Sequence, residues 1–128
     1  MTDDVKAIAR RFIERVVNTG DLDQIPTLVA PPLAEAMRRH VQGVRSTYPD
    51  LVVTVRSQIA EGDVVATRVT ATGTHSGEFR GLPPTHRTIV VEGVNIDRVA
   101  GGKIVEHWGA ANTLEALHAI GALPVGAG

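Results

Sequence analysis

Residues 48–74 read YPDLVVTVRSQIAEGDVVATRVTATGT, and within this stretch the spacing of apolar side chains changes from helical to strand-like. The opening YPD is typical of a turn that ends a helix. Apolar and polar residues then alternate along 51–59 and along 64–74, with many β-branched residues, and this period of two predicts strands. The EGD at 61–63 predicts a tight turn, so the two strands form an antiparallel hairpin.

Upstream of this stretch the apolar side chains follow a helical period. Residues 3–17 repeat them every three to four positions, which predicts an amphipathic helix. The NTGD at 18–21 predicts a helix end and a new start, so we expect a short helix at 22–30 that the following proline pair stops. A third helix is expected from Leu33 to Thr47.

Downstream, the chain returns to strands after a loop rich in glycine and proline at 77–84. Strands are expected at 88–99 and 103–111, then a last helical turn at 113–120 and a loose tail at 124–128. Helices followed by four consecutive antiparallel strands predict an α+β fold, in which the helices pack on one face of a curved four-stranded sheet. Such a sheet encloses a cone, and its mouth is the expected ligand site.

The composition is that of one small domain over residues 1–128, since 43% of the residues are hydrophobic and 21% are charged. A net charge of -1 and few aromatic side chains argue against nucleic acid as a partner. The chain has no cysteine, and no apolar run approaches the roughly 20 residues that cross a bilayer. The opening MTDD does not resemble a secretion signal, so we expect a cytoplasmic protein without a membrane partner.

Alternation along the second predicted strand indicates which side chains meet in the cone. Val69 and His75 share the less polar face, which we expect to line the pocket, with His75 at its mouth. His75 has two interpretations. It either contacts a ligand and transfers protons, or it closes a hydrogen bond in the loop next to Gly77.

In the last predicted strand, Trp108 and Asn112 share one face and His107 lies on the other. The indole of Trp108 belongs either to the core or to a pocket wall, where it offers a flat apolar surface to a polycyclic ligand. On the same wall, Asn112 would donate a hydrogen bond to a carbonyl or enolate oxygen.

The third predicted strand leaves the choice of face open, because neither of its faces is cleanly apolar. Glu92 and Arg98 share one face, where we expect ion pairs to neighbouring strands and contact with a second subunit in a homodimer. Asn95 and Asp97 share the other face. If that face is inside the cone, the carboxylate of Asp97 is an alternative acid or base.

The sequence contains none of the patterns that bind metals or common cofactors. The five histidines lack convergent metal-ligand spacing. Nor is there a Gly-x-Ser-x-Gly elbow, a P-loop or a dinucleotide fingerprint. We therefore expect neither a metal nor a cofactor.

A set of short motifs is shared with one known family. The set comprises Phe12, Asn18, Gly20, Asp21, YPD at 48–50, EGD at 61–63, GTHSGEF at 73–79, PPT at 83–85, Arg98, GKIVEHW at 102–108 and Leu114. With these motifs, and above all over 48–121, the chain resembles the SnoaL-like polyketide cyclases. They are a branch of the nuclear transport factor 2-like superfamily, which also includes ketosteroid isomerase and limonene epoxide hydrolase. The resemblance implies a cone-shaped α+β barrel and a cofactor-free enzyme of lyase or isomerase type in secondary metabolism.

The chain departs from the family's pattern in two places. Family members usually carry an acidic residue shortly after the tryptophan, which transfers protons in the cyclases, and here Asn112 stands at that position. Between the proline pair at 31–32 and Met37 the chain also lacks a stretch that contains a pocket-lining histidine in the family. Because an amide cannot transfer protons, the resemblance leaves open whether catalysis is altered or lost.

The leading hypothesis is an enzyme that folds a polyketide-like small molecule and polarises a carbonyl or epoxide. His75 acts as general acid or base, while Asn112 and Asn95 donate hydrogen bonds to a developing oxyanion. Apolar walls impose the reactive conformation, and they are formed by Trp108, Val69 and Phe12.

Three alternatives fit the same sequence. One is an isomerase or an epoxide-opening hydrolase that uses Asp97 as its acid or base. Another is a hydroxylase component that works with a reductase. The third is a protein that binds a small molecule without converting it, which the amide at Asn112 favours.

Overall fold

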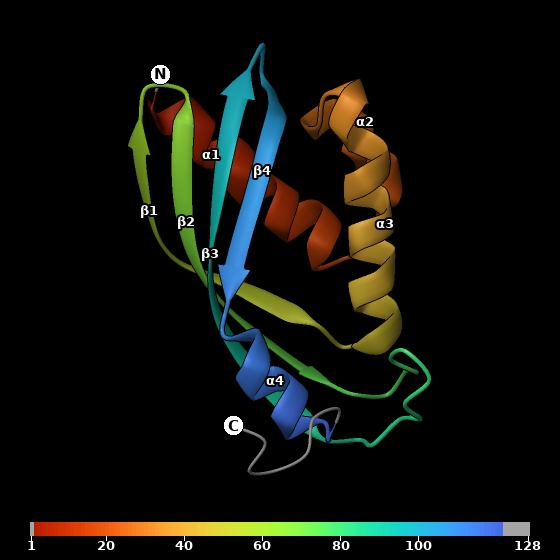
Figure 1. The fold of residues 1–128 in the computed structure, drawn as a ribbon. Helices are drawn as coiled ribbons and strands as arrows, with labels where there is room; N and C mark the ends of the chain where they lie inside the picture. Colours follow the sequence, from red (N-terminus) through yellow and green to blue (C-terminus); the bar gives the residue numbers. More distant parts are fainter. Residues whose placement is uncertain (1, 122–128) are drawn as a thin grey trace.

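The computed structural model describes residues 2–121, and the expected tail at 124–128 lies outside them. Helices come first and strands second, as Figure 1 shows, so the predicted α+β order is confirmed. No helix in this range is both long and apolar enough to cross a membrane. The elements are α1 (Thr2–Phe12), η1 (Ile13–Val17), η2 (Leu22–Gln24), α2 (Ile25–Leu28), α3 (Pro31–Thr47), β1 (Val52–Glu61), β2 (Val64–Thr74), β3 (Thr88–Ala100), β4 (Lys103–Ala111) and α4 (Thr113–Ala119).

The four strands form one antiparallel sheet in the order β1-β2-β3-β4. The tight turns of the outer hairpins use a left-handed backbone, which glycine supplies at Gly62 and at Gly101 and Gly102. Bulges interrupt the pairing at Arg56, an extra residue of β1, and at Val105, an extra residue of β4. Since a bulge increases the local twist, the sheet coils into a curved surface.

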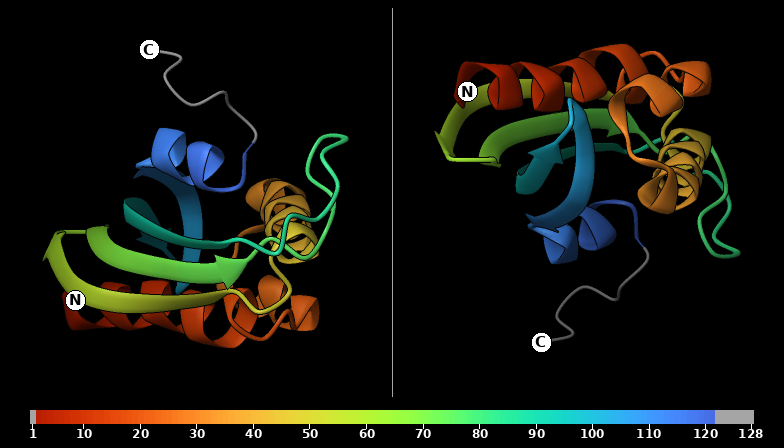
Figure 2. Two further views of the ribbon diagram at one scale, coloured as in Figure 1. Left: turned by 90° about the horizontal axis from the view of Figure 1, so that it is seen from below. Right: turned by 90° about the horizontal axis from the view of Figure 1, so that it is seen from above.

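The helices pack on one face of this sheet. In Figures 1 and 2, α1 crosses that face and α3 stands beside the edge strand β4. Apolar side chains of α1, α2 and α3 form the core there, together with Val65, Val99 and Ile104. The connection between α2 and α3 is fixed to β4 by Ala30, whose N–H donates to the Ile104 carbonyl at 2.9 Å.

The opposite face of the sheet, called the outer face below, carries large apolar side chains that remain exposed. Its charged groups include Arg98 and Glu106, whose Nε and Oε1 atoms lie 3.6 Å apart. This pair confirms the predicted ion pairing of Arg98 with a neighbouring strand. The exposed apolar side chains of the outer face are Val52, Ile59, Val90, Val94, Ile96 and Trp108.

The end of the first helix at Val17 agrees with the expectation, whereas the boundary between the second and third helices differs. The first helix ends in the single π-turn η1, where the Asn18 N–H donates to the Ile13 carbonyl at 3.0 Å. The proline pair at 31–32 begins α3 instead of only stopping the preceding helix. Proline fits the first helical turn, because the N–H groups there have no intrahelical partner. The second helix is correspondingly short and ends at Leu28.

Candidate functional site

A cavity of about 720 Å³ lies between the sheet and the helices. Its walls are mainly apolar and come from every layer of the fold. Phe12 and Met37 belong to the helical side, Val53 and Val69 to the sheet, and Leu117 to α4. This volume lies within the range of sites that hold small organic ligands.

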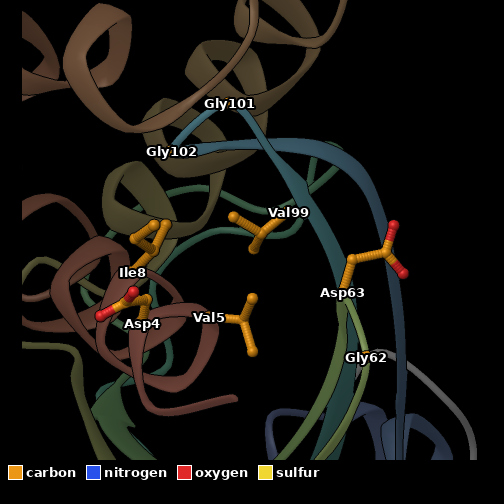
Figure 3. A pocket seen from close by; sticks show the side chains of 8 residues that line it. All are labelled: Asp4, Val5, Ile8, Gly62, Asp63, Val99, Gly101 and Gly102. Carbon is orange, nitrogen blue, oxygen red and sulfur yellow. The ribbon is translucent and has the colours of Figure 1, made fainter. Parts of the chain in front are cut away.

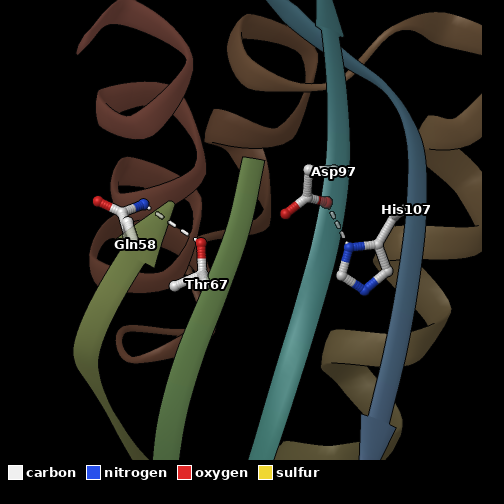
Figure 4. A network of polar contacts seen from close by, with 4 residues as sticks. All are labelled: Gln58, Thr67, Asp97 and His107. Atoms are coloured by element: carbon white, nitrogen blue, oxygen red, sulfur yellow. Dashed lines mark hydrogen bonds and ion pairs between the residues drawn. The ribbon is translucent and has the colours of Figure 1, made fainter. Parts of the chain in front are cut away.

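The wall of the cavity carries an acid–base pair. Asp97 in β3 and His107 in β4 are directly opposite each other in the antiparallel register. The Oδ1 of Asp97 lies 2.5 Å from the Nδ1 of His107, as drawn in Figure 4. The Asp97 side chain is 6% exposed and the His107 side chain 20% exposed, so a ligand can reach the histidine while the carboxylate is shielded from water.

The carboxylate of Asp97 determines which nitrogen of His107 carries a proton. An ionised carboxylate only accepts hydrogen bonds, so the Nδ1–H of His107 donates to it. The lone pair of the neutral ring then lies on Nε2, which points away from Asp97 in Figure 4. Nε2 is therefore the atom of the pair that can accept a proton from a ligand.

Two further polar side chains line the cavity near this pair. Asn95 lies on the same face of β3 as Asp97, and His40 comes from α3. His40 keeps an exposed surface, yet partial burial of its ring, and secondly the charge of His107, hold its pKa below the ordinary value. The two imidazoles are thus close enough to repel each other when both are protonated.

Four residues singled out in the sequence line this cavity, namely Phe12, Val69, Asn95 and Asp97. The structure brings them around one volume, and their chemical roles remain predictions. The sequence argument missed His107 as a site residue. The signal for it was cross-strand register, because a partner directly opposite Asp97 must share its face.

Trp108 does not line the cavity, which corrects the expected pocket wall. It lies opposite Ile96 on the outer face, and 53% of its surface is exposed. Neighbouring residues of a strand point to opposite faces, so a wall that contains His107 excludes Trp108. Because of its large aromatic side chain, Trp108 was the residue expected in the pocket wall. The strand register places His107 there instead.

Asn112 lies where β4 ends and α4 begins, and it does not line the cavity either. Its Oδ1 accepts a hydrogen bond from the Glu92 N–H at 2.9 Å, and its own N–H donates to the Glu92 carbonyl at 3.1 Å. These two bonds attach the start of α4 to β3. The expected position of Asn112 on a pocket wall is therefore corrected.

His75 is fully buried, and it does not line the cavity. Its Nδ1 accepts from the Thr85 N–H at 3.3 Å and lies 2.8 Å from the Thr85 Oγ1. Its backbone N–H donates to the Arg87 carbonyl at 2.9 Å. Of the two interpretations of His75, this geometry favours the one in which it closes the loop between β2 and β3.

A second hollow of about 580 Å³ lies where α1 begins, beside the turns that join the strands. Figure 3 shows Asp4 and Asp63 on opposite sides of it, with their carboxylates pointing apart. The residues between them are aliphatic or glycine, so this hollow holds no acid–base pair. Within the described range, no three His, Cys, Asp or Glu side chains converge as metal ligands would.

Comparison with known proteins supports the same fold. The family model described as SnoaL-like polyketide cyclase matches residues 7–120. IdmH of Streptomyces antibioticus, a candidate polyketide cyclase, is 31% identical over 91% of this chain and 98% of its own, with a TM-score of 0.81. AclR of Streptomyces galilaeus, a candidate hydroxylase, is 32% identical over 97% of this chain and 85% of its own, with a TM-score of 0.86.

A structure from Jannaschia sp. CCS1, assigned as a candidate SnoaL-like polyketide cyclase, is similar in fold. It is 22% identical over 96% of this chain and 95% of its own, with a TM-score of 0.87. Comparison with curated proteins gave no match.

Proposed function

This chain belongs to the SnoaL-like polyketide cyclase family, and we propose that it is an enzyme that moves a proton within a polyketide-like ketone and so cyclises or isomerises it. The observation that carries the proposal is the pair of Asp97 and His107 in the wall of a mainly apolar cavity. Such a volume binds the carbon skeleton of a ligand, while one base beside it acts on a single position.

The reaction begins at the Nε2 atom of His107. Nε2 takes a proton from the carbon next to a ligand carbonyl, and the electron pair of the broken C–H bond moves to the carbonyl oxygen to form an enolate. The enolate carbon then forms a C–C bond to a second carbonyl carbon of the same molecule. The proton on His107 passes to the resulting alkoxide, so the product is an isomer of the substrate.

Asp97 supports this step without contacting the reacting carbon. Its carboxylate keeps the proton of the neutral ring on Nδ1 and stabilises the imidazolium that forms during transfer. An amide in its place can donate to Nδ1 and so favour the tautomer whose Nε2 already carries a proton. Asp97→Asn is therefore expected to slow proton abstraction with little change in ligand binding.

The apolar walls supply orientation. Phe12 and Val69 face the same volume as the acid–base pair. Their rigid surfaces hold a ring system against the sheet, which converts a loose encounter into a fixed geometry. Met37 on α3 adapts its unbranched side chain to the remaining space.

Deuterium exchange into β-tetralone tests the proposal without knowledge of the natural substrate. This bicyclic ketone has acidic C–H bonds beside its carbonyl, and mass spectrometry detects their exchange in heavy water. The wild-type protein should accelerate the exchange, and His107→Gln should reduce the acceleration about a hundredfold. Glu106→Gln removes a carboxylate from the outer face and is the matched control, with the wild-type rate expected. Equal rates in wild type and His107→Gln would refute the proposal.

Hydroxylation is the second candidate function, because the chain is 32% identical to the candidate hydroxylase AclR. Incubation with the secondary metabolites of the host separates the two functions. A product of unchanged mass supports cyclisation or isomerisation, whereas a gain of one oxygen supports hydroxylation. A compound that binds and returns unchanged supports a binding protein.

We also propose that two copies of the chain associate through the outer face. Ile96 and Trp108 lie opposite each other there and remain exposed, which is unfavourable in water. Arg98 and Glu106 add both signs of charge to the same face. A twofold axis can therefore place the arginine of one copy against the glutamate of the other.

A further inference from the structure

Gly109 occupies a position in β4 where the backbone does not require glycine. The left-handed backbone that favours glycine occurs at turn residues such as Gly101 and Gly102, and Gly109 does not share it. Glycine weakens a strand, because it has no side chain to pack and loses more backbone freedom on folding than any other residue. The physical reason for glycine at this position therefore lies in the space beside it.

That space belongs to the cavity that holds the acid–base pair. Gly109 lines the cavity and lies directly opposite Asn95 in the pairing of β3 with β4. A Cβ atom on Gly109 would lie 3.3 Å from Oδ1 of Asn95 and 3.9 Å from Nε2 of His107. A side chain at this position would thus crowd the Asn95 amide and lie beside the His107 ring, whereas glycine leaves this part of the cavity wall open.

Because Gly109 has no Cβ atom, a ligand oxygen can approach the wall here, farther from the backbone than a Cβ atom would be, and so lie beside the Asn95 amide and the His107 ring. The Asn95 amide carries two N–H donors beside its oxygen, and half a turn of the amide brings them to the same place. The Nε2 of His107 accepts a hydrogen bond when neutral and donates one after it has taken a proton. A ketone oxygen therefore accepts only from the Asn95 amide at first, and the enolate oxygen then accepts from both the amide and the protonated ring, whereas an alkyl group accepts from neither.

We propose that Gly109 sets the specificity of the cavity by admitting a carbonyl oxygen between Asn95 and His107. The proposal rests on the proposed function, since it takes a ketone as the class of substrate. The substrate is a cyclic or polycyclic ketone whose enolisable C–H bond adjoins that oxygen, which brings the C–H bond to Nε2. After proton transfer, the imidazolium and the Asn95 amide both donate to the enolate oxygen and stabilise its charge.

Two probes with the same ring skeleton test this subsite. One is β-tetralone, and the other is the hydrocarbon tetralin, which lacks the oxygen. The dissociation constant of each is measured by displacement of anilinonaphthalene sulfonate from the purified protein. The proteins compared are wild type, Gly109→Ala, Asn95→Ala and Gly43→Ala.

Gly109→Ala should weaken β-tetralone binding about tenfold relative to tetralin binding, because the added methyl group excludes the hydrogen-bonded oxygen. Asn95→Ala should shift the ratio of the two dissociation constants, β-tetralone over tetralin, in the same direction without adding an atom. The test therefore still works if Gly109→Ala does not fold. Gly43→Ala is the matched control. It adds the same methyl group to α3 where no heavy atom lies within 4 Å, and it should leave the ratio unchanged.

An unchanged ratio in both Gly109→Ala and Asn95→Ala overturns the inference, as does a wild-type protein from which β-tetralone displaces no dye. Deuterium exchange separates this failure from that of the proposed function. If deuterium exchange requires His107 but the ratio of dissociation constants is the same in all variants, the proposed function is supported and the subsite is refuted. If the ratio shifts in both variants but the wild type catalyses no exchange, the subsite stands and the proton-transfer chemistry falls.

Discussion

At Asp97 and His107 the chain places a charged group inside a mainly apolar cavity. Burying a carboxylate is unfavourable unless it is paired, and the 2.5 Å contact with His107 offsets that cost. Replacing a buried charged group and its partner by apolar side chains of the same shape is often neutral or stabilising. Stability alone therefore does not account for this pair, which supports the proposed role in proton transfer.

His40 gives the site a measurable dependence on pH. Burial and the nearby His107 lower the pKa of folded His40 below its ordinary value of 6.5, so the unfolded chain binds the proton more readily. Above the ordinary pKa of histidine, the protein has the full stability that neutral His40 contributes. This contribution is lost as the pH falls from there through the lowered pKa of the folded protein. Asp97, which bonds to His107, limits the repulsion when His107 is protonated.

The prediction is that His40→Gln loses less stability than the wild type on acidification. Urea unfolding of both proteins, between about pH 7 and pH 5, measures the difference, because a glutamine cannot titrate. Parallel losses in the two proteins would show that His40 is not the group responsible.

The alternation along the third strand places Asn95 and Asp97 on one face, but nothing in the local pattern shows which face is inside. The register with β4 decides, since His107 lies opposite Asp97 and Trp108 opposite Ile96. A shift of one residue in that register would exchange the two faces, so local alternation alone cannot make the choice.

At the scale of elements, the end of α3 is joined closely to the loop that follows β2. The backbone N–H groups of Ser76 and Gly77 both donate to the Thr47 carbonyl, at 3.2 and 3.1 Å. The close approach requires glycine, because a Cβ on Gly77 would lie 1.7 Å from the Ser46 carbonyl oxygen. The helix and the loop are thus fixed to each other beside the cavity wall.

Gly77→Ala is expected to destabilise the protein by roughly 3 kcal/mol, because the methyl group forces the loop away from α3. Thermal unfolding should show a fall in Tm of about 10 °C. Gly43→Ala, on the exposed side of the same helix, should instead stabilise it by about 0.5–1 kcal/mol. Equal stability of Gly77→Ala and the wild type would contradict the close packing.

The elements themselves were the predictable part of the fold. The change from a helical period to alternation at 48–50 located the boundary between α3 and β1, and glycine-rich turns located the hairpins. The proline pair at 31–32 was less informative, because proline is compatible both with stopping one helix and with starting the next. The roles of Asn112 and His75 depend on contacts with distant residues, which no local pattern contains.

At the scale of the whole molecule, the exposed apolar side chains of the outer face predict a dimer. Sedimentation should give twice the mass of the chain for the wild type, and Trp108→Glu should shift it toward the monomer by placing a charge in the contact. Arg11→Glu changes the charge of an exposed residue of α1 and serves as the control, in which we expect the dimer to be retained. A wild-type monomer at all concentrations would contradict this association.

The most direct test of the central claim is the deuterium exchange rate of β-tetralone in a double-mutant cycle of Asp97 and His107. If the two residues act as one acid–base unit, the variant that carries both Asp97→Asn and His107→Gln will exchange no more slowly than His107→Gln alone. Losses that simply add, or a His107→Gln variant as fast as the wild type, would contradict the account.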